Sequence, residues 1–146
     1  MKFARLYLKA FGPFRDRVIE LPTGGANDFH VIFGPNEAGK STILRAVTGF
    51  LFGIPERTGD AFLHDYNALR VGATLLLPDG SRSSAMRRKA RKVTLFAVDE
   101  TTGAEITERP LSEGAASDLV GGLDLGLYQN LFGLDLNGLV AGSEEL

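Results

Sequence analysis

The ten residues FGPNEAGKST, from Phe33 to Thr42, restrict what this chain can fold into more than any other stretch of it. Gly34 to Ser41 match the pattern G-x-x-x-x-G-K-[ST], in which small residues let backbone N–H groups approach phosphate oxygens closely. A strand that leads into the loop and a helix that leads out of it strengthen this interpretation of the pattern. The residues on either side therefore decide how the match is interpreted.

Both flanks favour a phosphate-binding loop. FHVIF, residues 29–33, is a short and nearly continuous apolar run, which predicts a strand buried on both faces. Residues 40–53 carry apolar side chains at the spacing of a helix, which Gly53 and Pro55 should end. The apolar side chains at helical spacing are Ile43, Leu44, Val47, Phe50 and Leu51.

The predicted site binds a nucleotide through its phosphates. Backbone N–H groups of residues 36–41 and the positive end of the helix form the anion site, and Lys40 reaches the β- and γ-phosphates. The Ser41 hydroxyl is the expected Mg²⁺ ligand. The expected cofactors are ATP and Mg²⁺. Because the loop contacts the phosphates and not the base, GTP stays an alternative to ATP. The expected nucleotide-binding residues are Gly34, Pro35, Asn36, Glu37, Ala38, Gly39, Lys40, Ser41 and Thr42.

The composition excludes several other kinds of chemistry. The 146 residues suffice for one domain, and the absence of cysteine excludes a disulfide framework and any thiolate nucleophile or metal ligand. Lys9 and Gly12-Pro13 interrupt the N-terminal apolar residues, so no signal peptide is predicted. No apolar run approaches the ~20 residues that cross a bilayer. We expect a soluble, cytoplasmic chain without a membrane partner.

The rest of the chain predicts strands and then short helices. Residues 2–11 and 16–21 have the composition of two strands. Residues 69–107 contain alternating runs around turns at Asp79-Gly80 and Asp99–Gly103, which predicts antiparallel pairing. The expected fold class is α/β, a P-loop NTPase lobe in a single domain. Its parts are a nucleotide-binding core over 1–55, an inserted antiparallel β subdomain over 69–107, and glycine-broken short helices over 110–146.

A second motif has two interpretations. LFAVDE, residues 95–100, matches the strand of a P-loop enzyme that ends in an Asp for Mg²⁺ and a Glu that polarises water. With Asp99 and Glu100 in those roles, the chain would be a self-contained small NTPase or kinase. The competing interpretation is a hairpin turn, because DETTG lies between two alternating runs and Arg91-Lys92 stands just before the first.

Charge is distributed unevenly along the chain. Residues 1–92 carry 15 Lys or Arg and 8 Asp or Glu, whereas residues 93–146 carry 1 and 10. RSSAMRRKARK, residues 82–92, is either a solvated hairpin or a patch for nucleic-acid phosphates. Because no aromatic residues interleave with it, any nucleic-acid binding should be independent of sequence. The candidate nucleic-acid residues are Arg87, Arg88, Lys89, Arg91 and Lys92.

Four stretches together resemble the N-terminal half of an ABC-type ATPase head of the SMC, RecF, RecN and SbcC superfamily, and look closest to YhaN-like ATPases. They are LKAFGPFRDRVIEL, HVIFGPNEAGKSTILRAVTGFLFGI, LRVGATL and LGLYQNLFGLDLNGL. In that family a long coiled coil follows the N-terminal lobe, and a C-terminal lobe supplies the signature and Walker B motifs. Two heads hold two ATP molecules between them.

The resemblance implies a function, partners and further site residues. It implies ATP-dependent head dimerisation in DNA repair or DNA handling, with hydrolysis only once the C-terminal lobe is present. The implied partners are that lobe, a second head, DNA and an SbcD-type nuclease. Gln129 or Asp135 lies nearest the glutamine that completes the Mg²⁺ shell, and Arg15 or Arg17 could reach the nucleotide. Since a strand of the other lobe would cover residues 29–33, we expect the chain alone to expose an apolar edge.

Overall fold

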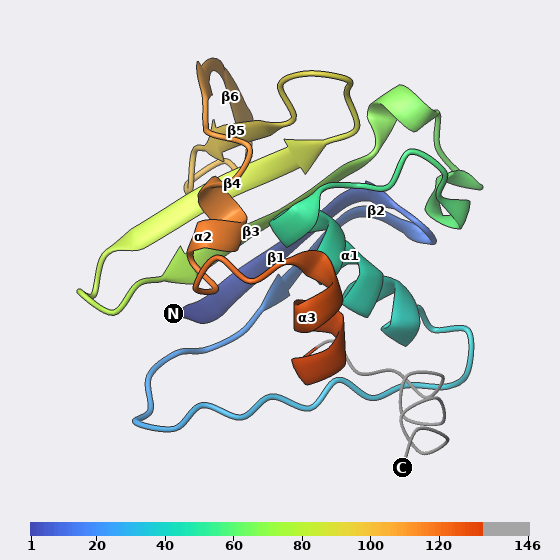
Figure 1. Ribbon diagram of the computed structural model, residues 1–146. Helices are drawn as coiled ribbons and strands as arrows, with labels where there is room; N and C mark the ends of the chain where they lie inside the picture. Colours follow the sequence, from blue (N-terminus) through green and yellow to red (C-terminus); the bar gives the residue numbers. More distant parts are fainter. Residues whose placement is uncertain (133–146) are drawn as a thin grey trace.

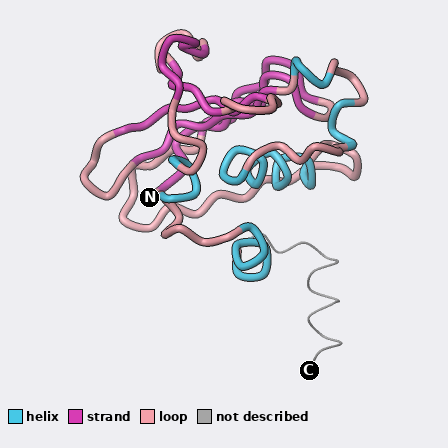
Figure 2. Tube along the Cα trace, turned by 45° about the horizontal axis from the view of Figure 1, so that its top comes forward, coloured by secondary structure: helices cyan, strands magenta, loops and turns pink. Residues whose placement is uncertain are grey.

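The computed structural model describes residues 1–132, which form a six-stranded antiparallel sheet with helices against one face (Figure 1). The sheet and the helices form two layers (Figure 2). The strand order is β2-β1-β3-β4-β5-β6. The strands are β1 (Lys2–Phe11), β2 (Phe14–Glu20), β3 (Arg70–Leu76), β4 (Arg82–Arg88), β5 (Leu95–Val98) and β6 (Glu105–Pro110). The helices are α1 (Lys40–Phe52), α2 (Ala115–Asp118) and α3 (Leu125–Leu131), with 3-10 turns η1 (Gly59–Ala61) and η2 (Tyr66–Ala68).

Helix α1 lies across the middle of the sheet and contacts β1, β3 and β4. Phe50 and Leu51 are buried in the same cluster as Leu8 of β1 and Val71 of β3. Burying a side chain of this size stabilises a fold by about 1.5–3 kcal/mol, so this cluster holds α1 against the strands. The helix predicted over 40–53 is confirmed, because its apolar face meets the sheet as its period requires.

Both turns expected from the local sequence are present. At the first, the Leu77 N–H donates to the Ser81 carbonyl at 2.8 Å, and Gly80 has a φ of 84°. At the second, the Asp99 N–H donates to the Ala104 carbonyl at 3.0 Å. The left-handed conformation at Gly80 carries little strain only for glycine, which explains why Asp-Gly marks this turn.

The strands of residues 69–107 continue a sheet that the N-terminal hairpin begins. β1 pairs with β2 on one side and with β3 on the other, where Leu6 lies opposite Ala73. The pairing of β1 with β3 joins segments about 65 residues apart in the sequence, and no local pattern predicts it. The N-terminal hairpin and the predicted β subdomain therefore share one sheet, and helix α1, which follows the phosphate loop, packs into the same core.

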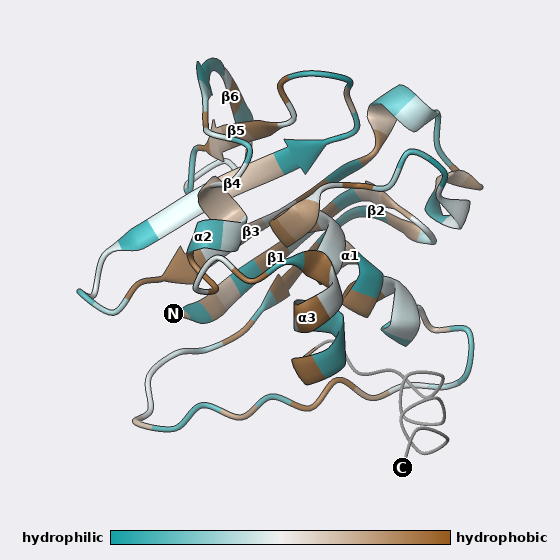
Figure 3. Cartoon of the chain, in the orientation of Figure 1, coloured by the Kyte–Doolittle hydropathy of each residue, from teal (hydrophilic) through white to brown (hydrophobic). Residues whose placement is uncertain are grey.

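The strand expected over residues 29–33 is absent, and this prediction is wrong for the described chain. The segment between β2 and α1 runs without regular structure, and it is partly apolar (Figure 3). Phe29 and Phe33 are 88% and 90% exposed. A strand buried on both faces needs hydrogen-bonding neighbours along its edges. Among residues 1–132 the sheet ends at β2 and β6, and no strand pairs with residues 29–33.

Candidate functional site

The phosphate loop turns into helix α1 at Gly39. This residue precedes the first helical turn and has a φ of 95°, in the left-handed region. A Cβ at Gly39 would lie 2.5 Å from Cζ of Phe14, at the start of β2. Glycine is therefore required here for two reasons, the backbone conformation and the close approach of the β1–β2 turn.

The amino-terminal end of α1 is free to bind an anion. Its first helical hydrogen bond runs from the Ile43 N–H to the Gly39 carbonyl at 2.9 Å, so the N–H groups of Lys40, Ser41 and Thr42 have no acceptor within the helix. No side chain caps this end, and its first turn contains no acidic residue. Such N–H groups, with the positive end of the helix dipole, form a site for phosphate oxygens.

The Lys40 side chain folds back across the loop. Its ammonium donates to the carbonyls of Gly34 and Pro35 at 2.5 and 2.8 Å. The charge is therefore held at the loop carbonyls, and Lys40 lines the same pocket as Ser41 and Thr42. A lysine and several free N–H donors lining one pocket suit a phosphate chain, so these residues fit the nucleotide predicted from the sequence.

A pocket of about 290 Å³ lies over this end of the helix. Its wall combines the loop with two segments that are distant in sequence: Pro13 from the β1–β2 turn and Phe62 from the segment after η1. Ser41 is exposed in it, where its hydroxyl is accessible to a Mg²⁺ ion carried by phosphates. The remaining lining residues are Asn36, Glu37, Gly39, Lys40 and Thr42.

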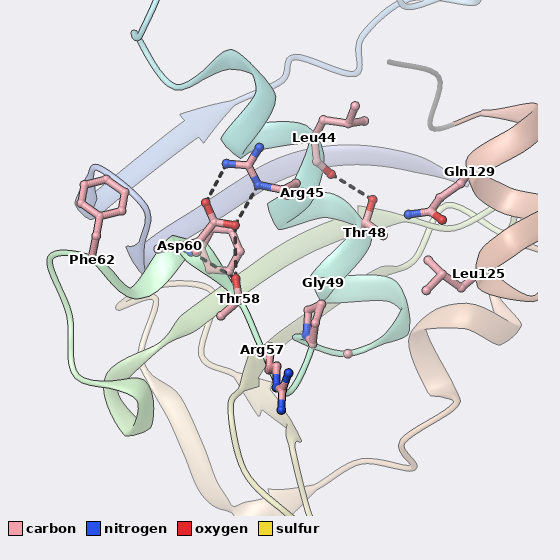
Figure 4. Close-up of a pocket in the computed structure, with 14 residues that line it drawn as sticks. Leu44, Arg45, Thr48, Gly49, Arg57, Thr58, Asp60, Phe62, Leu125 and Gln129 are labelled. Atoms are coloured by element: carbon pink, nitrogen blue, oxygen red, sulfur yellow. Dashed lines mark hydrogen bonds and ion pairs between the residues drawn. The ribbon is translucent and has the colours of Figure 1, made fainter. Parts of the chain in front are cut away.

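An ion pair with a buried carboxylate, which sequence reasoning missed, fixes the segment beside the loop. The Asp60 carboxylate accepts from Nε and Nη2 of Arg45 at 2.8 and 2.7 Å, and its side chain is only 5% exposed (Figure 4). Arg45 Nη2 also donates to Thr42 Oγ1 at 3.0 Å. The hydrogen bond to Asp60 raises the pKa of Arg45. In the sequence, residues 54–68 show no period, so nothing there distinguished Asp60 from a loop carboxylate.

A second cavity, of about 450 Å³, follows the carboxyl-terminal half of α1. Thr48 and Gly49 line it from α1, and Leu125 and Gln129 line it from α3 (Figure 4). Gln129 does not line the pocket over the phosphate loop, so its predicted part in a Mg²⁺ shell stays a prediction. Asp135, the alternative residue, lies outside the described residues.

The two candidate arginines of β2 differ in their contacts. Arg15 Nη2 donates to the Leu63 carbonyl at 3.3 Å, which ties β2 to the segment after η1. Arg17 is exposed on the edge strand. Their reach to the nucleotide stays a prediction.

Asp99 and Glu100 lie at the β5–β6 turn. The Asp99 carboxylate accepts from the N–H groups of Thr101 and Thr102, both at 2.9 Å, which is how aspartate stabilises a turn. Glu100 accepts from Ser84 Oγ at 3.0 Å and lies 3.4 Å from Arg82. These contacts favour the turn interpretation over the catalytic pair.

The basic cluster is divided by the fold, and its first candidate residue is buried. Arg87 is 1% exposed and donates to the carbonyls of Phe50 and Leu51 at the end of α1, so the prediction that it binds nucleic acid is wrong. A strand alternates its side chains between faces, and this register points Arg87 toward α1. Burial lowers the pKa of Arg87.

The other four basic residues remain at the surface to different degrees. The Arg88 guanidinium lies 4.1 Å from the ring centre of Phe96, and the Lys89 ammonium donates to the Pro55 carbonyl at 2.6 Å. Arg91 and Lys92 are exposed. Of these four residues, only Arg91 and Lys92 are exposed, so they are the ones that a phosphate backbone could reach most easily.

The comparisons agree with a nucleotide-binding site of the P-loop class. The family model AAA_27, described as an AAA domain, matches residues 1–146, and the chain belongs to this family. It is thus an AAA-type P-loop ATPase domain, a class that binds ATP, typically with Mg²⁺. No curated protein matches the chain. None of the described helices is both long and apolar enough to cross a membrane.

Proposed function

We propose that this chain is the ATP-binding N-terminal lobe of an ATPase head of the SMC, SbcC and YhaN type. The observation that carries the ATP-binding part is the free amino-terminal end of α1 with Lys40 lining the pocket over it, and the SMC, SbcC and YhaN type is proposed from the resemblance of the sequence. In this proposal the N–H groups of residues 36–41 bind the phosphates, Lys40 leaves the loop carbonyls to contact the β- and γ-phosphates, and Ser41 ligates Mg²⁺. Bound Mg²⁺ supplies positive charge against the phosphate oxygens.

Equilibrium binding of a fluorescent ATP in the presence of Mg²⁺ tests the phosphate site. The wild-type chain should bind, and Lys40→Ala should weaken binding at least tenfold, because a charge-assisted contact is lost. Lys9→Ala is the matched control: Lys9 of β1 is partly exposed and pairs with Asp16 of β2 at 3.6 Å, so its removal should leave binding unchanged. Equal loss in both variants, or no binding by the wild type, contradicts the proposal.

The proposal also assigns a partner to the exposed residues 29–33. A strand from a C-terminal lobe, pairing along this segment, would cover Phe29 and Phe33 and complete a second sheet around the loop. Alone, the chain should self-associate through these side chains. Sedimentation of the wild type should detect oligomers that Phe29→Ser with Phe33→Ser reduces. A monodisperse wild-type monomer that melts cooperatively would count against this part of the proposal.

Hydrolysis belongs to the assembled head in this proposal. The purified chain should therefore release no phosphate from Mg-ATP, and a Glu100→Gln variant should behave alike. The alternative is a self-contained NTPase that uses Asp99 and Glu100. It predicts turnover on the order of 1 s⁻¹ that both Lys40→Ala and Glu100→Gln abolish.

The role in DNA repair or DNA handling, with a second head and an SbcD-type nuclease as partners, is proposed by analogy with the superfamily. Within this chain, the exposed pair Arg91 and Lys92 supports it. Replacing both with alanine should weaken salt-sensitive binding to duplex DNA of any sequence, whereas Arg17→Ala, also exposed but on the edge strand β2, should not. DNA binding that is insensitive to salt would refute a phosphate-backbone contact.

A further inference from the structure

An exposed aromatic side chain stands at the rim of the phosphate pocket. Phe62 lines this pocket together with Lys40 and Ser41, and it is 65% exposed. It also borders the larger cavity along α1, where it lies to one side of the Asp60–Arg45 pair (Figure 4). An aromatic ring so exposed contributes little to the core, so its position calls for another explanation.

The backbone that carries Phe62 is fixed from three directions. Thr58 Oγ1 accepts from the Asp60 N–H at 3.1 Å and begins η1. The Asp60 carbonyl accepts from the Gly12 N–H at 2.6 Å, and its carboxylate is held by Arg45. On the other side of Phe62, the Leu63 carbonyl accepts from Arg15. The backbone on both sides of Phe62 is therefore held by hydrogen bonds, which restricts where the ring can lie.

The same contacts join this segment to the phosphate loop itself. Arg45 bonds to both Asp60 and Thr42, the residue that follows the loop motif in α1. Gly12 packs so closely on Thr42 that a Cβ at Gly12 would lie 2.5 Å from Thr42 Cγ2. The distance between the free N–H groups of α1 and the Phe62 segment is therefore set by short contacts through Thr42, Arg45 and Asp60.

We propose that Phe62 is the residue on which the base of the bound nucleotide stacks. The inference rests on the proposed phosphate site and adds what that site lacks, a contact with the base. Every nucleobase offers a flat face to an aromatic ring, and the larger purines offer more area than pyrimidines. The expected ligands are purine nucleoside triphosphates, with little distinction between ATP and GTP from this contact alone.

A binding comparison with and without the base tests the inference. Removing a stacking ring typically weakens binding at least about fivefold, so Phe62→Ala should weaken Mg-ATP by that factor or more. Its affinity for inorganic tripolyphosphate, which has phosphates but no base, should not change. Phe132→Ala is the matched control, because Phe132 is also 65% exposed and lines neither pocket. It should leave both affinities unchanged.

The chain contains no tryptophan, which allows a direct optical readout. In Phe62→Trp, the single indole should be quenched by ATP and not by saturating tripolyphosphate. This second variant keeps the test decisive if Phe62→Ala does not fold.

The outcomes separate this inference from the proposed function. If the wild type binds ATP no more tightly than tripolyphosphate, or if Phe62→Ala weakens both equally, the stacking role is refuted and the phosphate site stands. If the wild type binds neither ligand, the phosphate site and the stacking role fail together. Weakening of ATP alone supports both.

Discussion

Arg87→Met should lower the free energy of unfolding by about 2–6 kcal/mol, the cost of leaving two buried carbonyls without a donor. The guanidinium donates to the Phe50 carbonyl at 2.8 Å and to the Leu51 carbonyl at 3.4 Å, both at the carboxyl-terminal end of α1. It also donates to Oε2 and the carbonyl of Glu113, each at 3.1 Å. Methionine fills similar space but has no donor for these acceptors.

The magnitude follows from what the substitution leaves unpaired. Each buried carbonyl that loses its donor costs about 1–3 kcal/mol. Glu113 adds little, since its side chain is 48% exposed and regains water. Two carbonyls therefore account for most of the loss, which is a large part of the 5–15 kcal/mol that stabilises a typical domain. The positive charge at the end of the helix dipole is lost as well.

Urea unfolding at neutral pH measures the effect, with Arg88→Met as the matched control. Arg88 is the next residue of β4, and its side chain lies on the opposite face against Phe96 and Glu105. It remains 30% exposed, so its loss should cost no more than ~1 kcal/mol. Equal losses in the two variants, or a loss below ~1 kcal/mol for Arg87→Met, would refute the capping role of Arg87.

Three further predictions concern the loop and the turns. Gly39→Ala should destabilise the chain by about 1–3 kcal/mol and abolish ATP binding, since its Cβ would meet Phe14 and its φ is 95°; calorimetry and ATP titration check this, and unchanged values would contradict it. Asp60→Asn should lower the melting temperature by more than Asp65→Asn does, because only Asp60 is buried and paired with Arg45; equal shifts would show that the pair does not stabilise the segment beside the loop. Hydrogen bonds from Thr102 and Thr101 lower the pKa of Asp99, so its contribution to stability is present above the unfolded pKa of about 4 and is lost as the pH falls through the folded value. The urea midpoint of the wild type should therefore exceed that of Asp99→Asn at pH 7 by more than at pH 3, and a constant difference would refute the linkage.

Local signals in the sequence determined the elements that neighbouring residues can form by themselves. The loop and α1 follow from the motif and from a 3.6-residue period that ends at Gly53. The turns at Gly80 and Asp99 follow from residues that favour left-handed backbone or bond to their own turn. Each of these needs only contacts within a few residues, which is why pattern reading predicts them.

Only the tertiary structure decided which segments meet. Residues 29–33 have the composition of a buried strand, yet a strand forms only where it pairs with another, and no strand pairs with this segment among residues 1–132. Arg87 belongs to a basic run, but the register of β4 buries it under α1. Asp60 is held in place by its contacts with Arg45 and Gly12, and these contacts position Phe62, two residues later, in the lining of the pocket. These outcomes depend on pairings between distant segments, whose free energy is shared by the whole sheet and is not encoded in any one stretch of residues.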